Sequence, residues 1–231
     1  MRLRIELSTD TVEGAVAADA LGADRIELCS AGALGGLTPG PGLLRAVPAR
    51  CSVPVHVLIR PRDGGFVYAP SEVDAMLTDV AAAVDAGAAG VVVGALTSQG
   101  SLDASVLGEL RAAAEGLEVT CHRAVDTCRD PVAAVETLAT LGFHRVLSSG
   151  GATRAEDGAP VLARMVAAAP GLSVMACGGV RPHNALRIVE ATGVRDLHAA
   201  PRVPAGPEVP EFGTHATLDV EAARELLALP R

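Results

Sequence analysis

The fold is indicated by a stretch that contains the end of a predicted helix and the start of a predicted strand, Leu21-Gly22-Ala23-Asp24-Arg25-Ile26-Glu27-Leu28-Cys29. A glycine just past a helix adopts the left-handed conformation without a Cβ penalty, and the alternation that follows is typical of a strand. The same joint, a glycine after a helical run and an apolar residue after the glycine, recurs at Ala86-Gly87-Ala88, Leu141-Gly142-Phe143 and Thr192-Gly193-Val194. This repetition indicates parallel βα units.

Outward from this joint, strand-like runs alternate with Ala-rich helical runs along the chain. Eight strands are expected, at Leu3–Leu7, Arg25–Cys29, Val55–Arg60, Gly90–Gly94, Glu118–His122, Arg145–Ser149, Leu172–Cys177 and Asp196–His198. Helices are expected at Val12–Leu21, Ser71–Ala86, Ser105–Glu115, Pro131–Leu141 and Arg181–Ala191. The pattern favours an α/β fold, a (β/α)8 barrel of the TIM type, over an open doubly wound sheet, which stays the alternative.

The whole chain, residues 1–231, is expected to form a single TIM-barrel domain. No break in composition divides the sequence, and α/β barrels of this length are common as one unit. A stretch rich in Pro and Gly at about 199–217 predicts an irregular loop, and Val220–Leu229 predicts a last helix after it.

Composition excludes several classes of function. All 19 basic residues are arginines, which excludes a Schiff-base lysine and a phosphate-loop lysine. A net charge of -8 argues against nucleic acid and anionic membranes as partners. The five cysteines are widely spread, the first residues are charged, and no run of about 20 apolar residues occurs. These features predict a cytoplasmic protein.

The period of two along each strand predicts which side chains enter the barrel. If the apolar residues of each strand meet the outer helices, the intervening polar residues point inward. The inward residues near the C-terminal strand ends, where barrel active sites form, are Glu6, Glu27, Arg60, His122 and His198. Arg62, Arg123 and Asp126 follow in the adjoining loops.

These residue types suit acid–base and anion-binding chemistry. Carboxylates and imidazoles move protons or bind a divalent metal, and the candidates for such catalytic work are Glu6, Glu27, His122, Asp126 and His198. Guanidinium groups and glycine-rich loops bind carboxylates or phosphates, and the candidates for substrate binding are Arg60, Arg62, Arg123, Ser149, Gly150, Gly178 and Gly179.

A structural role is the alternative for several of these residues. Glu6, Glu27 and Arg60 could belong to a ring of charges that only plugs the barrel. A core histidine is the favoured interpretation of His56, and Arg4 and Arg25 are expected to form structural ion pairs. Tight turns explain the Gly-rich loops equally well.

The cysteines do not predict a closed zinc site, because no C-x-x-C pair occurs. Burial as small apolar side chains accounts for Cys51, Cys121 and Cys177. Cys29 differs from them, since its position in the strand points it inward, in line with Glu27 and beside Ser8.

At these residues the sequence resembles the CutC family, named for copper homeostasis. The matching segments are Gly22–Cys29, Gly35–Pro39, Ile59–Arg62, Val119–Asp126, Arg145–Gly150 and Leu197–His198. The resemblance implies a cytoplasmic, usually homo-oligomeric TIM-type barrel proposed to bind Cu(I) through cysteines near the first two strands. The matching second-strand cysteine is Cys29, while Ser8 stands where some members have a first-strand cysteine. Asp63-Gly64-Gly65 also departs from the Gly-Gly-Asp of the family.

Two functions follow as hypotheses. The resemblance implies a cytoplasmic copper homeostasis protein in which Cys29 binds Cu(I). The inward polar residues instead favour an enzyme that acts on a small anionic metabolite, phosphorylated or carboxylated, by acid–base or divalent-metal chemistry at the barrel mouth. A structural protein with a charged plug is the third alternative.

Overall fold

The computed structural model describes residues 2–207, 209 and 214–230 and shows a closed barrel of eight parallel strands, hydrogen-bonded in chain order from β1 to β8. The strands are β1 (Arg4–Thr9), β2 (Arg25–Leu28), β3 (Val55–Leu58), β4 (Gly90–Val93), β5 (Glu118–Cys121), β6 (Arg145–Ser148), β7 (Ser173–Ala176) and β8 (Asp196–Ala199). The closed TIM-type barrel and all eight expected strands are confirmed.

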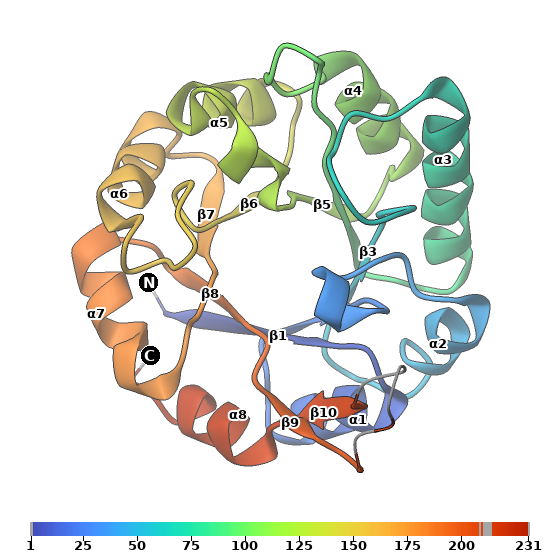
Figure 1. Ribbon diagram of the computed structural model, residues 1–231, viewed down its shortest axis with the longest axis vertical. Helices are drawn as coiled ribbons and strands as arrows, with labels where there is room; N and C mark the ends of the chain where they lie inside the picture. The colour runs from blue at the N-terminus through green and yellow to red at the C-terminus, as the bar shows by residue number, and fades with distance from the viewer. Residues whose placement is uncertain (1, 208, 210–213, 231) are drawn as a thin grey trace.

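Helices surround the barrel as an outer ring (Figure 1). They are α1 (Val12–Ala20), α2 (Pro41–Ala46), α3 (Pro70–Asp85), α4 (Ala104–Ala113), α5 (Pro131–Thr140), α6 (Ala159–Ala168), α7 (Pro182–Thr192) and α8 (Val220–Leu227). The single-turn helices η1 (Gly32–Leu34) and η2 (Arg123–Thr127) lie in the loops that follow β2 and β5. No helix in the described part of the chain is both long and apolar enough to cross a membrane.

The predicted helix-to-strand joint is present in three dimensions. Gly193 caps α7 with φ 74°, and Gly22 follows α1 with φ 78°, the left-handed region that a side chain disfavours. The helices α2 and α6 were not among the helical stretches named from the sequence. Both follow a glycine and carry a proline in the first turn, where proline is tolerated.

The irregular loop expected at about 199–217 contains regular structure at both ends. β9 (Arg202–Pro204) and β10 (Ala216–Leu218) pair as an antiparallel ribbon over α1, outside the barrel (Figure 1). Residues 208 and 210–213 of that stretch lie outside the described residues. The last helix begins at Val220, as expected.

The alternation along the strands sorts side chains between two faces. Ile5, Ile26 and Val57 belong to the main apolar cluster, which packs the strands against the helices. The opposite face carries buried charge at the N-terminal side of the barrel, where Arg25 is paired with Glu6 at 2.5 Å and Asp196 lies 2.6 Å from Arg4.

These buried ion pairs form a charged plug at the N-terminal side of the barrel, and the predicted core histidine, His56, belongs to it. His56 is 1% exposed, its Nε2 lies 3.5 Å from the Glu118 carboxylate, and Arg145 is bound to that carboxylate at 3.0 Å. Burial lowers the pKa of His56 to about 4. Charged side chains therefore fill the bottom of the barrel, as the structural alternative expected for Arg4 and Arg25.

Candidate functional site

Above the plug, the C-terminal mouth of the barrel opens into a pocket of about 490 Å³, here called the mouth pocket. Loops after most strands contribute to its wall, as is usual for barrel active sites. Its lining includes Ser8, Glu27, Cys29, Leu34, Leu58, Arg60, Phe66, His122, Arg123, Asp126, Cys177, Gly178, Gly179, Arg181, His198 and Arg202.

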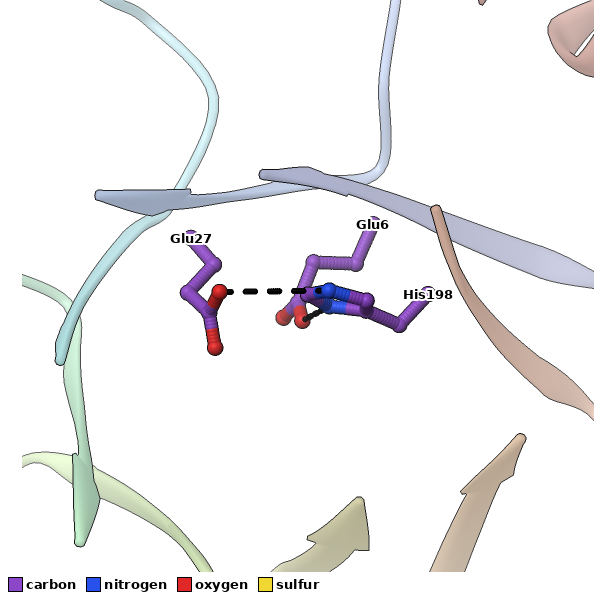
Figure 2. Close-up of side chains that lie close together, drawn as sticks. All are labelled: Glu6, Glu27 and His198. Atoms are coloured by element: carbon purple, nitrogen blue, oxygen red, sulfur yellow. Dashed lines mark hydrogen bonds and ion pairs between the residues drawn. The ribbon is translucent and has the colours of Figure 1, made fainter. Parts of the chain in front are cut away.

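Two carboxylates and one imidazole converge next to the mouth pocket (Figure 2): Glu27 and His198 line it, and Glu6 is buried beside them, outside the lining. Glu6 on β1, Glu27 on β2 and His198 on β8 each offer an atom within 4.8 Å of the others. The Nδ1 atom of His198 lies 2.7 Å from Glu6 Oε1, and its Nε2 atom lies 3.9 Å from Glu27 Oε2. The closed barrel makes this possible, because β8 pairs with β1 and places His198 beside Glu6.

The charges of the cluster depend on one another. Burial alone would raise the pKa of Glu6, but Arg25 and His198 together lower it well below its ordinary value. Among the described residues no arginine lies at hydrogen-bonding distance of Glu27, and burial raises the pKa of its carboxyl. Burial opposes a charge on His198, yet Glu27 and Glu6 outweigh it and raise the pKa of the imidazole. The pKa of Glu6 is therefore shifted down, while the pKa values of Glu27 and His198 are both shifted up.

Cys29 also lines the mouth pocket and is 2% exposed. Its Sγ atom is 3.8 Å from the Ser8 hydroxyl and 3.7 Å from the Thr9 carbonyl oxygen. Burial raises the pKa of the thiol to about 12, so the protein alone keeps it protonated. Among the described residues, Cys29 belongs to no group of three metal-ligating side chains within 4.8 Å of one another.

The three predicted anion-binding arginines are not brought together. Arg62 does not line the mouth pocket, because Glu72 pairs with its guanidinium and the Tyr68 ring stacks on it. Arg60 lines the pocket but donates to the carbonyl oxygens of Leu34, Gly36 and Gly64, which fixes the surrounding loops. Arg123 lines the pocket with its side chain 44% exposed.

Asp126 holds the loop after β6. Its carboxylate accepts hydrogen bonds from the backbone N–H groups of Ser149 and Gly151 and from the hydroxyls of Ser148 and Ser149. The N–H of Gly150 donates to the Ser148 hydroxyl. The donors that the sequence assigned to a bound anion at Ser149 and Gly150 are therefore taken up by the protein itself.

The loop after β7 has the opposite property. Within the described part of the chain, the N–H groups of Gly178 and Gly179 donate to no protein acceptor. Both glycines line the mouth pocket with positive φ, 90° and 72°, just before α7. Successive N–H groups in such a turn form a concave donor site for an anion.

His122 presents one ring nitrogen without a partner. Its Nδ1 atom accepts from the Ala124 N–H at 3.1 Å, so the neutral ring carries its proton on Nε2. Nε2 is buried and finds no hydrogen-bond partner in the part of the chain that the structure describes, and the ring packs 4.9 Å from the Phe66 ring. Burial and the nearby Arg60 lower the pKa of His122 to about 3, which keeps it neutral.

Several lining residues were missed by the sequence reasoning. Arg202 just beyond β8 pairs with Asp10 after β1 at 2.6 Å, and Phe66 packs against Arg60 and His122. The position of Arg202 three residues after the end of β8 was a usable signal. Nothing in the sequence marked Phe66, whose contacts depend on the folding of the loop after β3.

Comparison with known proteins gives one consistent family. A model of the CutC family matches residues 3–203. The human copper homeostasis protein cutC homolog is 45% identical over 199 residues, which cover 86% of this chain and 73% of that protein. A CutC family protein of Photobacterium profundum is 43% identical over 199 residues, or 86% of this chain and 81% of the relative.

Solved structures agree with this assignment. The CutC protein from Streptococcus agalactiae superposes with a TM-score of 0.80 at 29% identity, covering 85% of this chain and 97% of that one. A monomeric form of phosphoribosylanthranilate isomerase from Thermotoga maritima superposes with a TM-score of 0.60 at 12% identity, covering 97% of this chain and 96% of that one. At that identity the second likeness shows the barrel fold alone.

Proposed function

This chain belongs to the CutC family, and from that membership we propose that it takes part in copper homeostasis and works at the mouth pocket. The name of the human relative supports the first part. The second part is supported by the pocket itself, which contains the buried thiol that the family resemblance marks as the copper ligand, Cys29.

Cu(I) as cargo would use Cys29 as its thiolate ligand. Soft thiolates favour Cu(I), and binding requires the thiol proton to leave. Ser8 beside Cys29 supplies a hydroxyl, which is a poor ligand for a soft ion. Cys177 also lines the pocket, but among the described residues Cys29 belongs to no group of three metal-ligating side chains, so the site is not a closed one. We therefore expect copper at Cys29 to be exchangeable.

Copper binding is tested by titrating the reduced protein with Cu(I) against a competing chelator. Cys29→Ala should weaken binding at least tenfold. The matched control is Cys51→Ala, a thiol outside the mouth pocket, which should leave the affinity unchanged. Equal affinities for wild type and Cys29→Ala would remove Cys29 as the ligand.

The geometry supports a second function more fully, catalysis on a small anionic metabolite. One observation supports it: the mouth pocket is lined both by anion-binding groups and by proton-exchanging groups. The anion-binding groups are Arg123 and the N–H groups of Gly178 and Gly179, which have no acceptor among the described residues, and the proton-exchanging groups are Glu27 and His198. The first set suits a phosphate or carboxylate, and the second suits proton transfer.

In this function each residue has a distinct task. Gly178, Gly179 and Arg123 bind the anionic group, and the Nε2–H of His122 donates to a further oxygen of the ligand. Glu27 and His198 exchange a proton with the ligand. Glu6 orients the His198 ring by accepting its Nδ1–H, and Asp126 positions Arg123.

Anion binding is tested by thermal denaturation in the presence of inorganic phosphate or citrate. Either probe should raise the Tm of the wild type, and Arg123→Leu should reduce that increase. Arg45→Leu, an exposed arginine on α2, serves as the matched control. If neither probe stabilises the wild type, the anion site is absent.

A cytoplasmic, homo-oligomeric state completes the proposal. The five cysteines are free, which suits a reducing compartment. Val16 on α1, Leu186 on α7 and Val220 on α8 are exposed apolar side chains on neighbouring helices of the outer ring (Figure 1). Light scattering coupled to size exclusion should give a mass above that of one 23.3 kDa chain; a mass of one chain would contradict the oligomer.

A further inference from the structure

We propose that His198 Nε2 and the Glu27 carboxylate bind a divalent first-row transition-metal ion at the floor of the mouth pocket, with Glu6 as the carboxylate that orients His198 (Figure 2). The inference rests on the proposal that this pocket is the working site, and it names the ion that the site would use.

The first argument is a distance. His198 Nε2 and Glu27 Oε2 face each other at 3.9 Å, too far for a hydrogen bond. Zinc binds imidazole nitrogen and carboxylate oxygen at about 2.0–2.2 Å, so one ion spans a gap of this size with only a small inward movement of either side chain. The distance between His198 Nε2 and Glu27 Oε2 is therefore too long for a hydrogen bond but suits a metal ion bound between them.

The second argument is the arrangement behind the ligands. A metal-bound histidine commonly donates its other ring N–H to a carboxylate, which fixes the tautomer and the direction of the free nitrogen. Glu6 accepts from Nδ1 at 2.7 Å and is itself fixed by Arg25 at 2.5 Å. His198 therefore presents the lone pair of Nε2 toward Glu27.

The third argument is access and charge. Glu27 and His198 both line the mouth pocket and keep 8% and 12% of their side-chain surface exposed, so an ion can reach them. In the described part of the chain Glu27, unlike Glu6, has no arginine at hydrogen-bonding distance, and a metal ion beside His198 would compensate its buried charge.

The ligand set selects the class of ion. One imidazole and one carboxylate suit Zn²⁺, Mn²⁺ or Fe²⁺ better than Cu(I), which prefers sulfur. With two protein ligands, the remaining positions are left for water and for oxygens of the anionic ligand. The ion would polarise such an oxygen or lower the pKa of a bound water, and that water, in place of Glu27 and His198, would then exchange the proton with the anionic ligand.

The test uses Mn²⁺ alone as the probe, with the free ion measured by electron paramagnetic resonance during titration of the full chain. The wild type should bind one Mn²⁺ per chain, and Zn²⁺ should displace it. Glu27→Gln and His198→Gln should each weaken binding at least tenfold. Glu109→Gln and His183→Gln, exposed residues outside the pocket, are the matched controls and should bind as the wild type does.

Thermal denaturation separates misfolding from loss of the site. Both pocket variants should melt cooperatively without metal, and Zn²⁺ should raise the Tm of the wild type more than that of either variant. Absence of saturable Mn²⁺ and Zn²⁺ binding to the wild type, or unchanged binding in the folded Glu27→Gln and His198→Gln variants, would overturn the inference. Phosphate or citrate stabilisation in that case would leave the proposed function standing and remove only the ion.

Discussion

At the scale of single residues, two buried side chains, His122 and Glu27, support the proposal that the mouth pocket binds a ligand. Among the described residues the buried Nε2–H of His122 has no partner, whereas the buried Glu27 carboxylate interacts with Ser8 and His198. A buried donor without a partner costs free energy, and an oxygen of a bound ligand would satisfy it.

The place of the His122 ring depends on the absence of a side chain at Gly94. A Cβ atom there would lie 2.3 Å from the ring Cε1 and 2.5 Å from Nδ1. We expect Gly94→Ala to displace the ring, lower the free energy of unfolding by about 1–3 kcal/mol, and weaken stabilisation by phosphate. Urea denaturation measures the first effect and thermal denaturation with phosphate the second.

Gly42→Ala is the control for that substitution. Nothing lies within 4 Å of a Cβ atom at Gly42, which is in α2, so alanine should leave the free energy of unfolding unchanged or raise it by up to about 1 kcal/mol. If both variants unfold alike, the close approach of Gly94 to His122 has no energetic consequence.

At the scale of elements, the loops after β6 and β7 differ in structure, although the sequence predicted anion binding by both. The β6 loop binds the Asp126 carboxylate with its N–H groups, and the β7 loop keeps the N–H groups of Gly178 and Gly179 free. The β6 loop is thus held by the carboxylate of Asp126, whereas the N–H groups of the β7 loop are available to an anion from solution.

This division predicts different effects of removing the internal anion. Asp126→Ala leaves the Ser149 and Gly151 amides without their acceptor, so we expect faster hydrogen exchange at both and a loss of about 1–3 kcal/mol of stability. Asp126→Asn, which keeps one carbonyl acceptor, should lose less. Unchanged exchange in Asp126→Ala would show that the carboxylate does not order the loop.

At the scale of the whole molecule, the barrel interior has two layers, a charged plug below and the mouth pocket above. The plug contains Arg25, Arg145, Glu118, Asp196 and His56. Among the described residues each of these charged groups has an ion-pair partner, so this layer has the character of a structural plug. Glu27 and His198 line the mouth pocket.

The plug predicts a dependence of stability on pH. The pKa of His56 is about 4 in the folded protein, below its unfolded value, so the unfolded chain binds the proton first as the pH falls. The free energy of unfolding should therefore decrease from about pH 6.5 toward pH 4, and the lowered pKa of Glu6 adds to the decrease at the acid end. The raised pKa of His198 acts in the opposite direction.

Urea denaturation at a series of pH values measures this dependence. His56→Gln should show a shallower decrease than the wild type between pH 6.5 and 4.5. The exposed His183→Gln is the control and should follow the wild type. Parallel curves for wild type and His56→Gln would show that this imidazole does not contribute to the acid sensitivity.

The barrel and the direction of the polar side chains could be predicted from the sequence, because the helix-to-strand joints and the period of two are local properties of the chain. The sequence therefore predicted Glu6, Glu27 and His198 on one face of their strands. It did not predict α2 and α6, whose Pro and Gly residues indicate a loop when tertiary packing is not considered.

Which of the side chains that point into the barrel contact one another depends on the tertiary structure. Closure of β8 onto β1 places His198 between two carboxylates that are 21 residues apart in sequence, and loop folding takes Arg62 out of the pocket to Glu72. A period of two fixes the direction of a side chain, but its partner and its exposure depend on strand register, closure and loop conformation. Those are set by contacts between distant parts of the chain.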